Sequence, residues 1–99
     1  MDATDAKQRV LYRFLGHVQG RGFRYACVVC AERAHVTGWV RNERDGTVRA
    51  EVQGGAQEQL DFVKHVTALV PGFGNGWTIA SETKIDVVPD EQSFVVTRV

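Results

Sequence analysis

The segment from Gly16 to Arg24, GHVQGRGFR, has the residue types that can bind an anion. Glycines tolerate positive φ and allow successive backbone N–H groups to converge on one point. A helix that begins at the end of this segment would add unpaired N–H groups and the positive end of its dipole. The Arg24 guanidinium matches two oxygens of a phosphate and stays charged at physiological pH. The pattern indicates a phosphoryl ligand, although an ordinary strand-to-helix turn with a solvated Arg24 would have the same glycines.

A second segment with regularly placed glycines runs from Gly38 to Gly54 and contains Asn42. Together the two segments resemble the acylphosphatase family. The first family motif, G-x-V-Q-G-x-x-F-R, is met by Gly16, Val18, Gln19, Gly20, Phe23 and Arg24. The second, G-W-V-x-N-x-x-x-G-x-V-x-x-x-x-x-G, is met throughout from Gly38 to Gly54. The chain departs from the family at Arg21, where valine is usual, and at Phe14, where an aliphatic residue is usual.

The resemblance implies hydrolysis of small acyl phosphates, with inorganic phosphate as product and competitive ligand. It assigns Arg24 to the phosphoryl oxygens and Asn42 to orientation of the attacking water, for which a carboxamide has both a donor and an acceptor. Backbone N–H groups of one loop would complete the phosphate site, those of His17, Val18, Gln19, Gly20, Arg21 and Gly22. We expect the Gln19 side chain to brace this loop and Arg21 to point outward at its rim. No cofactor or metal ion is expected, because no Asp-rich or His-rich cluster has coordination spacing.

Two other functions compete with hydrolysis. A non-catalytic module that recognises carbamoyl phosphate or a phosphorylated partner would need Arg24 but not Asn42, which by itself would be read as a turn-capping residue at a strand end. Binding of single-stranded RNA would need exposed aromatic residues on the central strands, amid basic residues. Tyr12 and Phe14 lie on the more apolar side of the first strand, where helices are expected to cover them, so RNA binding ranks last.

The pair Cys27 and Cys30 forms a C-x-x-C pattern, which can indicate a redox or metal site. The chain has no second cysteine pair and no histidine pair at zinc spacing, and the two intervening residues are valines. Phe23 and Ala34 fall on the same helical face as the two cysteines. We therefore interpret both cysteines as reduced, small hydrophobic residues of the core.

The composition favours one small domain over residues 1–99. Lysine plus arginine equals aspartate plus glutamate at twelve each, so the overall charge provides no attraction to nucleic acid or anionic lipid. No apolar run is long enough to span a bilayer, and the first residues are polar and acidic, unlike a signal sequence. We expect a cytoplasmic monomer with no nucleic-acid or membrane partner.

Periodicity predicts the elements that must position the site. Alternating and β-branched runs predict strands over 9–18, 37–42, 47–53, 79–88 and 94–99. Apolar residues at helical spacing predict helices over 22–35 and 57–69, the second with a buried side formed by Leu60, Phe62, Val63, Val66 and Leu69. The Asp45-Gly46 pair favours a hairpin, and the glycine-dense stretch 72–76 is expected to be mobile or tightly turned.

This order predicts an α/β chain with the ferredoxin-like α+β sandwich, β-α-β-β-α-β with a short final strand. Two helices would cover one face of an antiparallel sheet of four to five strands. The same architecture is used by RNA-recognition and metal-binding modules, so the site must decide the function.

Overall fold

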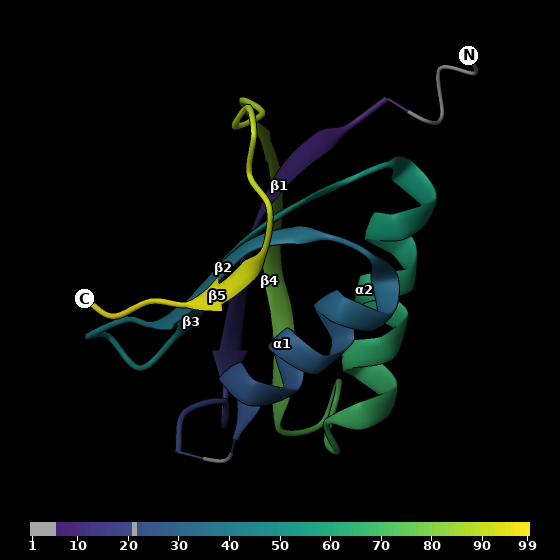
Figure 1. Ribbon diagram of the computed structural model, residues 1–99. Coiled ribbons are helices and arrows are strands. Elements are labelled where there is room, and N and C mark those ends of the chain that lie inside the picture. Colours follow the sequence, from purple (N-terminus) through teal and green to yellow (C-terminus); the bar gives the residue numbers. More distant parts are fainter. Residues whose placement is uncertain (1–5, 21) are drawn as a thin grey trace.

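The computed structural model describes residues 6–20 and 22–99, and its elements follow the predicted order (Figure 1). They are β1 (Gln8–Gly16), α1 (Phe23–Ala34), β2 (Thr37–Asn42), β3 (Val48–Gly54), α2 (Ala56–Leu69), β4 (Trp77–Ile85) and β5 (Phe94–Val96). Both helices cover the same face of one sheet, whose strand order is β4-β1-β3-β2-β5. The ferredoxin-like α+β prediction is therefore confirmed. Within the described ranges, no helix is both long and apolar enough to cross a membrane.

The sheet is mixed, which corrects the prediction of an antiparallel one. The pairs β1–β3, β1–β4 and β2–β3 are antiparallel, whereas β5 is parallel to β2. The connection over 86–93 leaves β4 at one edge of the sheet and enters β5 at the other edge. Since β2 and β4 run in opposite directions, a chain that turns back after β4 runs alongside β2 in the same direction.

Packing of the aromatic side chains agrees with the expected core. Tyr12 and Phe14 are buried beneath the helices, and Phe14 makes edge-on contacts with Phe23 and Trp77. Burial of these large rings supplies much of the apolar area that stabilises a small domain. It also removes the two strand aromatics from any nucleic-acid surface.

The buried side of α2 differs from the prediction. Leu60 is 65% exposed and Leu69 is 47% exposed. Phe62 and Val66 are buried as predicted, and Val63 is partly buried against the core. Gln59 was not predicted to be buried, but it lies on the same helical stripe as Phe62 and Val66. Gln59 is satisfied there, because its amide accepts a hydrogen bond from the Tyr12 hydroxyl at 2.8 Å and donates one to the main-chain oxygen of Val52.

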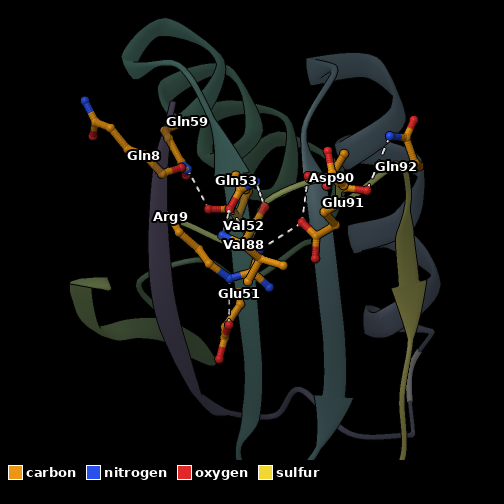
Figure 2. Close-up of polar contacts among 11 residues, drawn as sticks. Gln8, Arg9, Glu51, Val52, Gln53, Gln59, Val88, Asp90, Glu91 and Gln92 are labelled. Atoms are coloured by element: carbon orange, nitrogen blue, oxygen red, sulfur yellow. Dashed lines mark hydrogen bonds and ion pairs between the residues drawn. The ribbon is translucent and has the colours of Figure 1, made fainter. Parts of the chain in front are cut away.

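The crossover over 86–93 is fixed on the open face of the sheet, the face away from the helices (Figure 2). Arg9 is buried there, and its guanidinium donates to Glu51 at 2.7 Å and to Glu91 at 2.8 Å. The Gln53 amide donates to the main-chain oxygen of Val88 and accepts from its N–H, both at 2.8 Å. These contacts set the path of the chain into β5 and thereby place the residues that follow it.

Candidate active site

The loop between β1 and α1 has the backbone conformation that the glycines suggested. Gly20 and Gly22 both have φ of 75°, and β1 ends earlier than predicted because Gly16 turns the chain at φ 101°. A side chain at Gly16 would also collide with the turn before β4, since an added Cβ would lie 2.7 Å from the Cα of Trp77. That turn, over 72–76, is tight, with the Gly74 N–H donating to the Trp77 oxygen at 2.8 Å.

Two of the backbone donors predicted to bind phosphate are already used within the chain. The His17 N–H donates to the Gly76 oxygen at 2.8 Å, and the Val18 N–H donates to the Gly16 oxygen at 2.9 Å. These bonds fasten the loop to the turn before β4, and Val18 places its side chain in the core. Arg21 lies outside the described residues.

The start of α1 offers further donors. Its N-cap is Gly22, which has no side chain to accept a hydrogen bond, and its first turn contains no acidic residue. The first helical hydrogen bond runs from the Ala26 N–H to the Gly22 oxygen at 3.0 Å, so the N–H groups of Phe23, Arg24 and Tyr25 precede the helical ladder. Uncapped N–H groups together with the helix dipole favour an anion at this position.

A pocket of about 280 Å³ lies at this helix end and brings Arg24 and Asn42 together. The other residues that line it are Val18, Gly20, Gly22, Phe23, Tyr25, Val96 and Arg98. Arg24 is half-buried, and no described carboxylate forms an ion pair with it. Its guanidinium is thus available to an anionic ligand.

Asn42 ends β2 at this pocket, and its Oδ1 atom is buried without a hydrogen-bond partner among the described residues. Buried acceptors in folded proteins are nearly always hydrogen-bonded, so an unpaired one beside a pocket indicates a group that binds there. A water molecule is a hydrogen-bond donor small enough for this pocket.

The Gln19 side chain braces the loop, as predicted. Its Nε2 donates to the main-chain oxygens of Glu43 at 2.8 Å and Thr47 at 2.9 Å. Glu43 directly follows Asn42, and its N–H closes the β2–β3 hairpin on the Thr47 oxygen at 2.9 Å. One amide therefore fixes the distance between the glycine loop and the strand end that carries Asn42.

Three lining residues, Tyr25, Val96 and Arg98, were not identified from the sequence. Tyr25 directly follows the matched motif, and this position is its only signal in the sequence. In the structure its side chain is 73% exposed. Val96 and Arg98 reach the pocket because β5 lies beside β2, a placement that depends on the crossover. No residue spacing in the sequence indicates that β5 lies beside β2.

Cys27 and Cys30 are free and fully buried, in agreement with their assignment to the core. Burial raises the pKa of both thiols above the ordinary value, for Cys27 with a smaller contribution from Cys30. Neither thiol is ionised at neutral pH, and the thiolate is the reactive form. In the described part of the chain, no three His, Cys, Asp or Glu side chains are grouped so that they could hold a metal ion.

Comparison with known proteins agrees with the motifs. The family profile described as Acylphosphatase matches residues 10–95. An acylphosphatase of Salinibacter ruber is 53% identical over 84 residues, which cover 80% of this chain and 88% of that protein. One from Clostridium beijerinckii is 36% identical over 74 residues, covering 75% and 77% of the two chains. The crystal structure of an acylphosphatase from Bacillus subtilis superposes with a TM-score of 0.75 at 26% identity, covering 93% of this chain and 99% of that one.

Proposed function

Since the chain belongs to the acylphosphatase family of hydrolases, we propose that it hydrolyses small acyl phosphates at the pocket shared by Arg24 and Asn42. The single observation that carries this assignment is the buried, unpaired Oδ1 of Asn42 in the same pocket as Arg24. An anion-binding module without catalysis would need Arg24 alone. It would have no use for a water site opposite the anion.

The phosphoryl group would be held by charge and by main-chain donors. Arg24 would bind two of its oxygens, while N–H groups of the loop and of the first turn of α1 would bind the others. The donors still available in the described loop are those of Gln19, Gly20 and Gly22, because His17 and Val18 donate to carbonyl oxygens. Arg21 would contribute its N–H, with its side chain at the rim.

Asn42 would hold the attacking water. Its Oδ1 would accept one hydrogen bond from the water, which directs a lone pair of the water oxygen toward phosphorus. The carboxamide does not ionise, so this orientation would persist across the physiological pH range. Gln19 would act as a positioning residue, since it keeps the hairpin that carries Asn42 at a fixed distance from the loop.

The chemistry needs little more than positioning. The water oxygen forms a bond to phosphorus as the bond from phosphorus to the bridging oxygen breaks. The carboxylate leaves with that electron pair, and R–CO–O–PO₃²⁻ plus water becomes R–COO⁻ plus H₂PO₄⁻. Because a carboxylate is a good leaving group, neither a general acid nor a Lewis acid is required for its departure. In-line alignment and charge stabilisation are the main contributions expected from the protein.

Hydrolysis of benzoyl phosphate and of p-nitrophenyl phosphate by the purified protein, with a chelator present, tests this proposal. We expect rapid turnover of the acyl phosphate, competitive inhibition by inorganic phosphate, and poor activity on the monoester. Equal activity on both compounds would contradict the leaving-group argument. Complete loss of activity in chelator would contradict metal-independent hydrolysis.

We also propose that the enzyme acts as a cytoplasmic monomer without a cofactor and without a nucleic-acid or membrane partner. The equal numbers of acidic and basic residues support the absence of a nucleic-acid or membrane partner, because the overall charge attracts neither. Analytical ultracentrifugation at micromolar concentration should give one species at the monomer mass.

A further inference from the structure

Three arginines stand side by side on the open face of the sheet. The strand register pairs Arg13 of β1 with Arg49 of β3, and Arg49 with Arg41 of β2. Their neighbours along the strands, such as Phe14, Val48 and Val40, point into the core, so the three arginines lie on the face away from the helices. Like charges directly opposite each other on paired strands are destabilising.

Two carboxylates from the β2–β3 hairpin offset this charge only in part. Glu43 Oε1 lies 2.9 Å from Arg41 Nε and 3.8 Å from Arg49 Nε, so one oxygen serves two arginines. The Oδ2 of Asp45 lies 3.6 Å from the guanidinium of Arg13. The Oδ1 of Asp45 accepts two hydrogen bonds from Thr47, one from the hydroxyl group at 2.6 Å and one from the main-chain N–H at 3.0 Å. Hydrogen bonds from Thr47, and secondarily the charge of Arg13, keep the pKa of Asp45 below its usual range.

A hollow of about 650 Å³ lies against these side chains. We call it the arginine hollow; its lining residues are Arg13, Glu43, Arg44, Asp45, Thr47, Arg49 and Val99. The Nε of Arg49 is buried and has no hydrogen-bond partner within the described residues.

The charge of this region is strongly local. With Arg41 at its edge, the hollow has four arginines and two carboxylates, a side-chain charge of +2 in a protein whose formal net charge is +0. It shares no lining residue with the pocket of Arg24 and Asn42. A ligand here would therefore occupy a second site.

We propose that the arginine hollow binds a chain of two or more linked phosphates, the chemistry common to inorganic polyphosphate and the tail of a nucleoside triphosphate. Neighbouring strands are about 4.8 Å apart, so the row of three arginines spans about 10 Å, more than a single phosphate can bridge. Each guanidinium offers a planar fork of donors that matches phosphate oxygens. The Nε of Arg49, which has no hydrogen-bond partner among the described residues, would gain an acceptor.

A nucleic-acid strand fits this surface less well. Base stacking needs exposed aromatic faces beside the basic groups. The aromatic residue on this face next to the row is Trp39, and the Arg41 guanidinium covers its ring at 4.8 Å from the centroid. A compact ligand that carries its charges on phosphates alone needs no such face.

Calorimetric titration of the intact protein with tripolyphosphate tests the proposal. The titrations use the Arg24→Gln protein, so that binding at the other pocket is removed. In this protein we expect the arginine hollow to bind tripolyphosphate more tightly than inorganic phosphate. The affinity for tripolyphosphate should fall as the salt concentration rises. Adding Arg13→Gln and Arg49→Gln should weaken binding by about tenfold or more. Adding Arg33→Gln, an exposed arginine in the last turn of α1, should leave it unchanged.

Titrations with a second ligand identify the source of the phosphates. A single substitution in an exposed loop tests the site in case the variant with several changes does not fold. Tighter binding of ATP than of tripolyphosphate would indicate a nucleotide ligand, and equal binding would indicate polyphosphate itself. The single change Arg44→Gln, in the exposed hairpin loop, should weaken binding without affecting the fold. Unchanged affinity in both the double and the Arg44 variants would overturn the proposal, as would binding of an oligonucleotide with none of tripolyphosphate. Benzoyl phosphate turnover, measured with Arg24 intact, tests the proposed function separately.

Discussion

Replacement of Asn42 by alanine should affect activity and stability in opposite directions. The Oδ1 of Asn42 is buried and makes no hydrogen bond with a described residue, so its removal breaks no hydrogen bond within that part of the protein. An unpaired buried polar group typically costs about 1–3 kcal/mol. Because the residue as a whole is only half-buried, we expect the free energy of unfolding to stay constant or rise by about 1 kcal/mol.

The catalytic effect of the same change should be large. Loss of one group that is aligned with the reacting atoms typically lowers kcat by about 10²–10³, or about 2.7–4 kcal/mol in the barrier. Binding of inorganic phosphate should be unaffected, because Arg24 and the backbone donors remain. The assays are benzoyl phosphate kinetics, phosphate titration and urea unfolding of the same preparation.

The exposed Asn75, in the turn before β4, provides the matched control. Asn75→Ala should leave kcat, phosphate affinity and stability unchanged. Near-normal turnover of the Asn42→Ala protein would show that another residue holds the water. A clear loss of stability would show that Asn42 has a structural role instead.

Three further predictions concern the glycine loop, the crossover into β5 and the core. Gln19→Ala should lower kcat and reduce the free energy of unfolding by about 1–2 kcal/mol, because it removes two hydrogen bonds that position the hairpin. A Gln19→Glu protein should show the same loss, because a carboxylate cannot donate these hydrogen bonds. Wild-type kcat in Gln19→Glu would contradict this role. Arg9→Leu should reduce the free energy of unfolding by about 3 kcal/mol, since Glu51 and Glu91 lose their common partner; an unchanged urea midpoint would refute it. Changing Cys27 and Cys30 to alanine should reduce stability by about 1–2 kcal/mol in total while specific activity persists; a rise in wild-type activity on addition of reductant, with folding unchanged, would revive a redox role.

Local patterns predicted those parts of the molecule that depend on neighbouring residues. The glycine positions and the two motifs indicated a strand-to-helix loop with Arg24 at the helix start and Asn42 at a strand end, and the pocket contains both. Periodicity located both helices and all five strands, apart from their boundaries. These features follow from steric limits and side-chain spacing within a single element.

Features that depend on contacts distant in the sequence were not predictable in this way. Gln59 is buried because Tyr12 and two main-chain oxygens happen to surround it. The parallel direction of β5, and with it the presence of Arg98 in the pocket, depends on a crossover held by Arg9 and Gln53. The His17 N–H is occupied because the turn before β4 lies next to the loop.

Inorganic phosphate should bind to the loop after β1 and to the first turn of α1, together with Arg24. Amide chemical shifts in ¹H–¹⁵N spectra, recorded during titration with inorganic phosphate, locate this binding residue by residue. We predict the largest shifts at the N–H groups of Gln19, Gly20, Gly22 and Phe23, smaller ones at His17 and Val18, and loss of all of them in Arg24→Ala. Shifts confined to the arginine hollow, or shifts in the loop that persist at unchanged affinity in Arg24→Ala, would show that Arg24 and this loop do not bind the phosphoryl group.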